Sequence, residues 1–374
     1  MKVILAAGGS GGHIYPAIAL AEALESEGVR GTDIMIVASK KRLDVNILSG
    51  YKYRKEHLSA NPMPRGHNII KWVVFAWKLS CDSVCSLISI LMFRPDVVVG
   101  FGGYSSGTIS IASYIMGTPV VIHEQNVVPG RANKMLSRIA RLIAVSFKGS
   151  EQYFPGSEEK VVYTGNPLRK DSLYGDRNGA CERLGLRMDR FTVLIMGGSQ
   201  GATSLNRISS RAALMIKGMP QGDGIQFLHL AGRSDIEETS KFYRENDIPG
   251  KVMPFLERIS DAYSLCDLAV SRAGAAAVFE LACFGRPMVL VPYPNPRNSQ
   301  GHNARYFSEA GAAICMEEKD ISADDLAGCI YELFSNNMKR ELLARAATRL
   351  ANPFSARSLA REVMSLPGKK GNDR

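Results

Sequence analysis

The sequence predicts an α/β protein built from two doubly wound, Rossmann-like domains, each with a parallel sheet. Strand-like apolar runs alternate with helical patterns over nearly the whole chain, which is typical of parallel sheets. Two similar glycine loops, 8–13 and 197–202, lie about half a chain apart, and each follows an apolar strand and opens a helical pattern. A length of 374 residues is sufficient for two domains of ordinary size.

The first domain is expected to cover residues 1–164. Its predicted strands are 2–7, 34–38, 96–99 and 119–122. A helix is predicted for 14–27, where apolar residues recur every three to four positions. A third glycine loop, 100–107, follows the third of these strands.

The pattern restarts in a second domain, expected to cover residues 165–352. Its predicted strands are 191–196, 225–230, 251–254, 267–271, 288–292 and 312–316. The segment 353–374 is expected to return to the first domain. Open α/β sheets bind ligands at the carboxyl ends of their strands, where the glycine loops of this chain fall. We therefore expect a phosphorylated ligand in a cleft between the two domains.

Composition narrows the classes of partner. The net charge of +10 favours an anionic partner, but no basic tract interleaved with aromatic residues indicates nucleic acid. The seven cysteines show neither a CxxC motif nor zinc-ligand spacing, so neither disulfides nor a metal site is expected. Gly8 interrupts the first apolar run after a few residues, and no signal peptide is expected.

One apolar segment, 68–93, does not fit a simple α/β core. A buried helix is the expected structure for most of it, because Lys71, Lys78 and Asp82 argue against a membrane span. The alternative is insertion of aromatic side chains into a membrane interface. The aromatic candidates are Trp72, Phe75 and Trp77.

A basic pattern supports the membrane alternative. Arg131, Lys134, Arg138 and Arg141 would form one stripe on a single helix reaching Leu142. A solvated helix face is the ordinary meaning of such a stripe. Anionic lipid headgroups would give it a function, and we expect the first domain to dock reversibly on an anionic membrane surface.

The glycine loops do not match the common nucleotide fingerprints. Ile14 stands where the third glycine of GxGxxG is required, and no acid follows the second strand, which ends in Ser39, Lys40 and Lys41. NAD is therefore disfavoured, although Lys40 and Lys41 leave NADP open. GxxxxGK[ST] is absent, and no Asp-x-Asp pair is present to hold a metal on a nucleotide diphosphate. Backbone amides and helix N-termini remain as the means of binding phosphate, with no cofactor.

The second domain carries a further strand-to-helix turn at 272–275. Glu280 follows it by about two helical turns among apolar neighbours. A carboxylate in that setting needs a partner, and the two hydroxyls of a ribose would supply one.

Taken together, these motifs resemble the MurG family of peptidoglycan N-acetylglucosaminyltransferases, in glycosyltransferase family 28. The segments that carry the resemblance are 8–13, 100–104, 123–126, 165–169, 197–202, 271–275, Glu280 and 300–304. The resemblance implies a GT-B fold and an inverting hexosyltransferase. The implied reaction moves GlcNAc from UDP-GlcNAc to the C4 hydroxyl of MurNAc in undecaprenyl-pyrophosphoryl-MurNAc-pentapeptide (lipid I), giving lipid II.

The resemblance also implies where each substrate binds. The first domain would hold the lipid acceptor at the cytoplasmic face of the inner membrane, and the second would hold UDP-GlcNAc. It further implies a peripheral membrane location and a place in peptidoglycan synthesis, cell shape and cell division, with a cell-wall synthesis complex as a possible partner.

The general base is left open between two residues. His13 lies at a helix N-terminus, which favours a neutral imidazole suited to a base, although a simple capping role fits equally well. Glu124 is the alternative base, beside Asn126 at a strand end. We expect all three side chains to contact the acceptor.

The remaining roles follow from the resemblance. The donor set is Ser10, Gly11, Gly12, Asn126, Arg169, Ser199, Gln200, Gly201, Phe255, Ile259, Arg272, Glu280, Gln300 and Asn303. Phe255 and Ile259 would recognise uracil, and Gln300 and Asn303 would contact the sugar. The acceptor pyrophosphate set is Gly9, Ser10, Gly11, Gly12, Gly102, Gly103 and Tyr104. Membrane contact is assigned to Trp72, Phe75, Trp77, Arg131, Lys134 and Arg138.

Three other functions stay open at this point. They are a UDP-GlcNAc epimerase of the same fold, an NADP-dependent oxidoreductase, and a carrier-lipid binding protein without catalysis. Release of UDP from UDP-GlcNAc, with and without lipid I, separates them.

Overall fold

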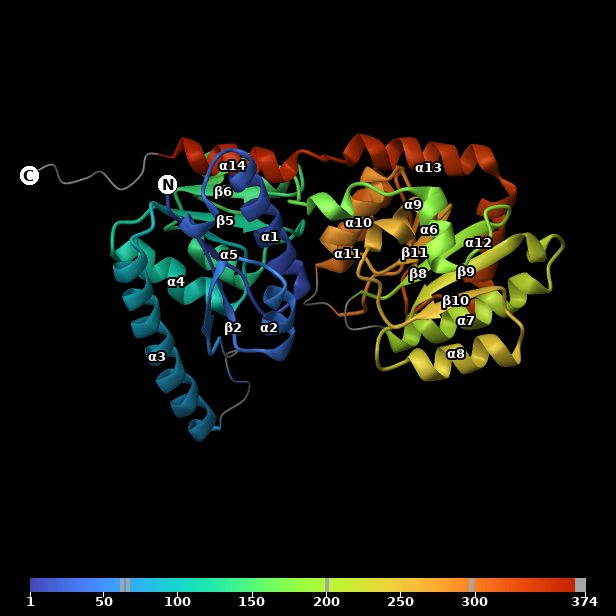
Figure 1. The fold of residues 1–374 in the computed structure, drawn as a ribbon, viewed down its shortest axis with the longest axis horizontal. Coiled ribbons are helices and arrows are strands. Elements are labelled where there is room, and N and C mark those ends of the chain that lie inside the picture. The colour runs from blue at the N-terminus through green and yellow to red at the C-terminus, as the bar shows by residue number, and fades with distance from the viewer. Residues whose placement is uncertain (61–63, 65–67, 199–201, 296–298, 367–374) are drawn as a thin grey trace, which may run out of the picture. The chain divides into compact units, whose positions relative to one another are not determined.

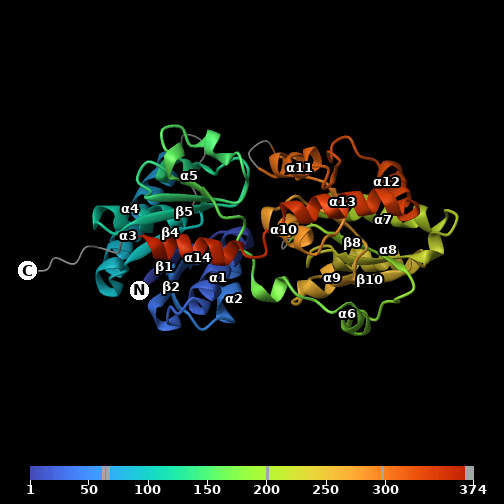
Figure 2. The same cartoon turned by 90° about the horizontal axis from the view of Figure 1, so that it is seen from above.

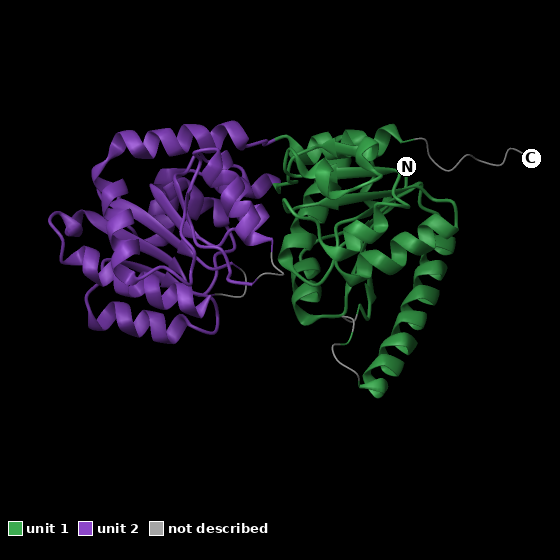
Figure 3. Ribbon diagram, turned by 180° about the vertical axis from the view of Figure 1, so that it is seen from behind, with its two compact units in different colours: residues 1–169, 354–374 green, residues 170–353 purple. Residues whose placement is uncertain are grey.

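Two parallel sheets organise the chain in the computed structural model, one in each of two units. Unit 1 comprises residues 1–169 and 354–374, and unit 2 comprises residues 170–353 (Figure 3). The structure describes residues 1–60, 64, 68–198, 202–295 and 299–366. Within that part of the chain, each sheet has helices on both faces, so the predicted α/β fold class is confirmed.

The sheet of unit 1 has the order β3-β2-β1-β4-β5-β6-β7, and every neighbouring pair is parallel. Its strands are β1 (Val3–Ala6), β2 (Ile34–Ser39), β3 (Arg54–Leu58), β4 (Val97–Gly100), β5 (Val120–Glu124), β6 (Leu142–Val145) and β7 (Val161–Tyr163). The strand order reverses between β1 and β4. Open α/β sheets bind ligands at such a switch point, and the first and third glycine loops both follow these two strands.

Helices cover both faces of this sheet (Figure 1). The helices are α1 (Gly11–Ser26), α2 (Arg42–Ser49), α3 (Ile69–Phe93), α4 (Tyr104–Ile115), α5 (Arg131–Leu136) and α14 (Ser355–Ser365). Val3 and Leu5 pack in one core with α1 and α14, while Ile4 and Ala6 pack in another with α3 and α4. This alternation along β1 shows why its sequence is apolar throughout: a parallel strand is buried on both sides. Figure 2 shows α14 lying beside α1.

Unit 2 repeats the plan with six parallel strands in the order β10-β9-β8-β11-β12-β13. The strands are β8 (Phe191–Met196), β9 (Ile225–Leu230), β10 (Gly250–Met253), β11 (Leu268–Ser271), β12 (Met288–Leu290) and β13 (Ile314–Cys315). The helices are α6 (Arg177–Leu184), α7 (Thr203–Lys217), α8 (Ile236–Glu245), α9 (Ile259–Leu265), α10 (Ala275–Cys283), α11 (Gln300–Glu309), α12 (Ala323–Ser335) and α13 (Asn337–Leu350). The switch point lies between β8 and β11, which precede the second glycine loop and the Arg272 turn.

The sequence missed three strands of unit 1 and misread one helix. β3 is an edge strand of mostly polar residues, β7 is an edge strand of only three residues, and β6 was assigned to the helix carrying the basic stripe. That helix, α5, ends at Leu136, and Leu142 begins β6. The single stripe over 131–142 is therefore wrong, although Arg131, Lys134, Arg138 and Arg141 are all exposed.

The expectation of a buried helix over 68–93 is also wrong. α3 is one helix of 25 residues, and most of its surface is exposed. Trp77 is 72% exposed and Ile70 is 75% exposed. Only the side that carries Asp82, Ser86 and Phe93 is packed on the unit, and Figure 1 shows the N-terminal end of α3 projecting from it.

By length and composition, α3 is the one helix in the described residues that could cross a membrane. Its most apolar window has a mean hydropathy of 1.5, and 22% of that window is buried. The carboxylate of Asp82 lies on the packed side, where it accepts hydrogen bonds from the backbone N–H groups of Ser59 and Ala60. These bonds fix α3 to the loop after β3.

Candidate active site

The first and third glycine loops of unit 1 meet at the carboxyl ends of β1 and β4. A Cβ added at Gly103 would lie 2.4 Å from the carbonyl oxygen of Gly8, so the two backbones are in direct contact. Gly102 and Gly103 also have φ values of +93° and +81°, which L-residues with side chains rarely adopt. The contact brings the N-termini of α1 and α4 to the same place.

The N-terminus of α1 offers backbone N–H groups at this place. Ser10 is the N-cap residue, but its side chain does not cap the helix. The first N–H groups of an α-helix have no partner within the helix and, together with the helix dipole, attract anions. Gly11 and Gly12 begin α1, Tyr104 begins α4 with 52% of its surface exposed, and Gly9 and Gly102 lie in the loops that precede these two helices.

His13 lies at this position with a defined orientation. Its Nδ1 is 3.1 Å from the carbonyl oxygen of Gly8 and 3.4 Å from Ser10 Oγ. A carbonyl oxygen only accepts, so Nδ1 carries the hydrogen and Nε2 of the neutral ring holds the lone pair. Nε2 faces Gly102, where an added Cβ would be 3.3 Å away. No hydrogen bond of Nε2 is found in the part of the chain that the structure describes.

Glu124 has a different environment from the one a base requires. It is only 2% exposed, and four donors bind its carboxylate. Oε1 accepts from the backbone N–H and the side-chain amide of Asn126, at 3.0 and 3.1 Å. Oε2 accepts from the N–H of Gly130 at 3.0 Å and from Asn133 Nδ2 at 2.8 Å. The carboxylate fixes the loop after β5, and with it Asn126.

Two residues of this region were missed by the sequence analysis. Asn133 is buried and also donates to the carbonyl of His123, which links α5 to the end of β5. Asp44, on α2, is fully buried, and its Oδ2 accepts from the N–H of Gly9 at 2.8 Å. Neither residue belongs to a recognisable motif, because each acts through a contact between segments far apart in the chain.

Two buried histidines have structural roles, one in each unit. His123 Nε2 donates to the carbonyl of Gly165 at 3.2 Å, and His229 Nε2 lies 3.1 Å from Asn206 Oδ1. Burial lowers the pKa of His123 to about 4 and the pKa of His229 to about 3. Both rings are therefore neutral at pH 7, and neither is a catalytic candidate.

Acid should unfold the protein in part through these two rings. Their folded pKa values lie below the unfolded value of 6.5, so their stabilisation is complete above pH 6.5 and is lost as pH falls toward 4 and 3. We expect the free energy of unfolding to fall by about 3 kcal/mol per ring between pH 7 and pH 4. In denaturant titrations, the free energy of unfolding of His229→Gln should fall by about 3 kcal/mol less than that of the wild type between pH 7 and pH 4. His302→Gln, at an exposed position, should show the same fall as the wild type. Equal pH dependence in both variants would contradict the assignment.

In unit 2, the residues predicted to bind the diphosphate are only partly visible. Ser199, Gln200 and Gly201 lie outside the described residues. Arg272 is 5% exposed, and its guanidinium forms an ion pair with Glu318 and donates to the carbonyl of Val291 at 3.1 Å. Its charge is therefore largely balanced within the unit, a pairing that the sequence did not indicate.

The other predicted donor residues lie around the carboxyl ends of β11 and β12. Glu280, on α10, accepts from the hydroxyl of Tyr263 at 2.8 Å, so a protein partner meets the need seen in the sequence. Gln300 Oε1 accepts from the N–H of Tyr293 at 3.0 Å. Asn303 is fully buried and donates to the carbonyl of Ala273 at 3.1 Å, which ties α11 to the Arg272 turn.

Three further predicted residues have distinct settings. Phe255 is 48% exposed in the loop after β10, and Ile259 begins α9. Arg169 belongs to unit 1, where its guanidinium lies 4.5 Å from the ring centre of Tyr15. The structure thus places Arg169 in unit 1 beside Tyr15 of α1, in the same unit as Ser10, Gly11, Gly12 and Asn126 of the predicted donor set.

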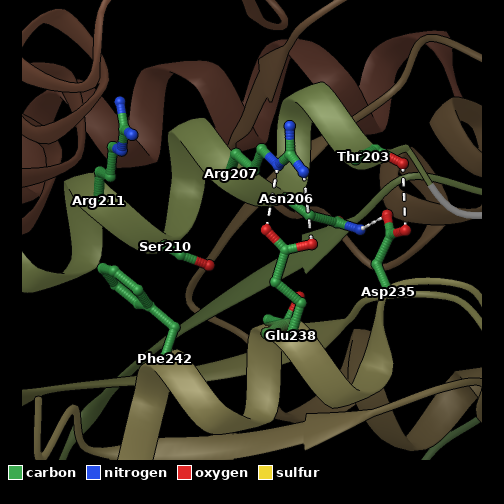
Figure 4. Close-up of a pocket in the computed structure, with 9 residues that line it drawn as sticks. Thr203, Asn206, Arg207, Ser210, Arg211, Asp235, Glu238 and Phe242 are labelled. Carbon is green, nitrogen blue, oxygen red and sulfur yellow. Dashed lines mark hydrogen bonds and ion pairs between the residues drawn. The ribbon is translucent and has the colours of Figure 1, made fainter. Parts of the chain in front are cut away.

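A pocket of about 260 Å³ lies between α7 and α8 of unit 2 (Figure 4). Arg207 and Glu238 form an ion pair across it, and Asp235 accepts from Thr203 and Asn206. None of the predicted site residues lines it. Its polar groups are largely satisfied by one another, so the pocket is not the candidate active site.

Comparison with known sequences decides the family. Residues 3–145 match the glycosyltransferase family 28 N-terminal domain, and residues 192–362 match the glycosyltransferase family 28 C-terminal domain. The chain belongs to glycosyltransferase family 28. The family 28 matches divide the chain between its two sheets, and the predicted GT-B class of fold is confirmed.

Family 28 relatives resemble the chain along nearly its whole length. The protein of Halothermothrix orenii is 32% identical over 367 residues, which is 96% of this chain and 97% of its own. That of Methylococcus capsulatus is 33% identical over 98% of this chain and 99% of its own. Both are named UDP-N-acetylglucosamine--N-acetylmuramyl-(pentapeptide) pyrophosphoryl-undecaprenol N-acetylglucosamine transferase.

Solved structures agree with this family assignment. The crystal structure of Acinetobacter baumannii MurG matches with a TM-score of 0.75 at 25% identity, over 98% of this chain and 100% of that one. The predicted resemblance to the MurG family is confirmed. A UDP-GlcNAc 2-epimerase from Neisseria meningitidis reaches a TM-score of 0.72 at 12% identity over 98% of this chain, which shows a shared fold alone.

Proposed function

We propose that this protein transfers GlcNAc from UDP-GlcNAc to the C4 hydroxyl of MurNAc in lipid I, forming lipid II. The family 28 relatives that carry this activity in their names align with almost the whole chain. The observation that carries the proposal is the orientation of His13, whose Nε2 lone pair faces the paired glycine loops. A passive lipid-binding protein has no use for a base at this position, and an epimerase of soluble sugar nucleotides has no use for the exposed apolar side of α3.

The proposed reaction is one in-line displacement with inversion. The C4 oxygen of the acceptor forms a bond to C1 of GlcNAc as the bond from C1 to the UDP oxygen breaks. The hydroxyl proton passes to Nε2 of His13, because that nitrogen holds the lone pair. Glu124 holds Asn126 in position for the acceptor, and UDP leaves with its charge on the diphosphate.

We further propose that unit 1 holds the acceptor and unit 2 holds UDP-GlcNAc. The glycine loops of unit 1 would bind the lipid pyrophosphate. The loop at 199–201 and the Arg272 turn would bind the UDP diphosphate through N–H groups and helix N-termini. Because Arg272 is paired with Glu318, backbone groups carry more of this role than the sequence suggested.

Release of UDP tests the proposed activity against the alternatives. UDP should appear from UDP-GlcNAc only when a soluble lipid I analogue is present, together with the disaccharide product. UDP release without acceptor, or interconversion of the sugar, would indicate epimerase chemistry. Oxidation of NADPH without UDP release would indicate an oxidoreductase, and binding of the analogue without any turnover would leave a carrier-lipid binding protein.

The donor role of Glu280 is tested by two variants. Glu280→Ala should raise KM for UDP-GlcNAc roughly tenfold, with KM for the acceptor within twofold, if the carboxylate binds the ribose hydroxyls. Tyr263→Phe removes only the hydroxyl that donates to Glu280 and should change KM for UDP-GlcNAc much less. Equal effects of the two variants would mean that Glu280 serves only to hold Tyr263.

We propose a peripheral location at the cytoplasmic face of the cell membrane, with α3 as the contact. The exposed apolar side of α3, with Trp72 and Trp77 exposed and Phe75 half-buried, supports interfacial insertion. Exposed Arg131, Lys134 and Arg138 would meet anionic headgroups at about 1 kcal/mol each. Partners in a cell-wall synthesis complex would then be reached through the same membrane.

Sedimentation with anionic phosphatidylglycerol vesicles tests this location. Trp77→Glu should weaken binding at least tenfold, because it places a charge at the centre of the apolar face. Met338→Glu is the matched control, since Met338 is 74% exposed on α13 of the other unit, and it should bind as the wild type does. Failure of the wild type to sediment at low salt would refute the proposal.

A further inference from the structure

A lysine that no expected role accounts for lies over the first glycine loop. Lys41 follows β2, and its Nζ is 3.8 Å from the point where a Cβ on Gly9 would stand. The residue is exposed. Across the residues that the structure describes, its ammonium group has no ion pair or hydrogen bond. In the sequence analysis, Lys41 had a role only in the disfavoured NADP alternative.

The backbone of Lys41 is fixed to that loop through a chain of hydrogen bonds. The N–H of Lys41 donates to Ser39 Oγ at 3.3 Å, and Ser39 Oγ donates to Asp44 Oδ2 at 2.5 Å. The same Oδ2 accepts from the N–H of Gly9 at 2.8 Å. These hydrogen bonds hold the backbone of Lys41 in a defined position relative to Gly9, and the ammonium group extends from that position.

Asp44 makes a cation at this point electrostatically useful. Its carboxylate is fully buried directly below Gly9. A buried negative charge beside the loop disfavours a second anion there. A lysine ammonium on the outer side of the same loop offsets that repulsion and leaves the N–H groups of α1 able to attract phosphate.

Helix stability does not explain the choice of lysine. Lys41 is the N-cap residue of α2, and its side chain forms no capping hydrogen bond. Serine, aspartate and asparagine are the stabilising residues at this position, and a positive charge opposes the helix dipole. Lysine therefore adds no stability to α2 at this position, and its ammonium group is free to meet an anion at the first glycine loop.

We propose that Lys41 is a further pyrophosphate-binding residue, contributing its ammonium group to the acceptor site at the first glycine loop. The ligand class is a diphosphate ester, and the source to which the geometry points is the lipid acceptor, because Lys41 belongs to unit 1. This inference rests on the proposed function for the identity of the acceptor. Lys41 adds a side-chain cation to a site otherwise made of backbone groups. Ser39 and Asp44 act as positioning residues, because they hold the backbone of Lys41.

The test compares Lys41→Ser with Lys40→Ser in the full-length protein. Lys40 is the adjacent exposed lysine, so both variants lose one charge from the same short segment. Lys41→Ser should raise KM for a soluble lipid I analogue roughly tenfold, with kcat and KM for UDP-GlcNAc within twofold. Because serine is a better N-cap, the thermal midpoint of this variant should equal or exceed that of the wild type. Lys41→Arg should restore most of the lost acceptor affinity.

Each contrary outcome has a definite meaning. Equal effects of Lys40→Ser and Lys41→Ser would show general electrostatic attraction and overturn the proposal. A rise in KM for UDP-GlcNAc instead of the acceptor would assign Lys41 to the donor diphosphate and also overturn it. A lower thermal midpoint that accounts for lost activity would reduce Lys41 to a structural residue.

A binding measurement separates this proposal from the proposed function. Inorganic pyrophosphate should bind the wild type and Lys40→Ser alike and Lys41→Ser roughly tenfold more weakly, by equilibrium titration. If Lys41→Ser binds pyrophosphate more weakly than the wild type but the wild type transfers no GlcNAc, the proposed activity is wrong and the proposed anion site is retained. If the wild type transfers GlcNAc but Lys41→Ser changes neither pyrophosphate affinity nor KM for the acceptor, the inference about Lys41 is wrong and the proposed activity is retained.

Discussion

His13→Ala should lower kcat by roughly 10²–10⁴-fold, the range expected when a general base is removed. The structure gives the physical reason. The carbonyl of Gly8 accepts a hydrogen bond from Nδ1–H of His13. The lone pair of the ring is then on Nε2, which faces Gly102. Alanine leaves no other group at that place to accept the proton of the acceptor hydroxyl. Initial rates at saturating UDP-GlcNAc and acceptor measure the change.

Two further measurements separate a base from a helix cap. Added imidazole should restore part of the activity of His13→Ala, because His13 is partly exposed and a small ring can take its place. The thermal midpoint of His13→Ala should stay close to that of the wild type, because a base contributes to the rate and not to the fold. A kcat within threefold of the wild type, with a lower thermal midpoint, would leave His13 with the capping role alone.

Glu124→Ala should destabilise unit 1 by roughly 3–5 kcal/mol, because it removes a buried acceptor shared by four donors, of which the Asn133 amide is itself buried. The loop that carries Asn126 and the start of α5 would lose its fixed position. We expect kcat/KM for the acceptor to fall at least 10²-fold, while KM for UDP-GlcNAc stays nearly unchanged. Thermal denaturation and steady-state kinetics measure the two effects.

Glu124→Gln distinguishes an anchor from a base. Glutamine offers one oxygen and one NH₂ group where the protein presents four donors, so this variant should lose stability as well as acceptor affinity. Glu151→Gln, at an exposed position in the same unit, should behave as the wild type. Unchanged stability with a large loss of kcat would instead make Glu124 the base.

The sequence could predict the two sheets because their strands are buried on both faces. The run Val193 to Met196, for example, is apolar throughout and is followed directly by Gly197. The edge strands lack such a signal, because four of the five residues of β3 are polar and β7 has only three residues. The order of the strands then brought the first and third glycine loops together, as expected for a switch point.

The sequence by itself determined the fold class, the glycine loops at the strand ends and the family, because these depend on local periodicity and on residues close together in the chain. The tertiary structure alone decided which side chains could do chemistry. The proton position on His13, the four donors on Glu124, the pairing of Arg272 with Glu318 and the place of Lys41 over Gly9 all depend on contacts between distant segments. The exposure of α3 was decided in the same way, because burial depends on what else packs against the sheet. Local sequence patterns do not reveal these contacts, because the hydrogen-bond partner or the covering element comes from a distant part of the chain.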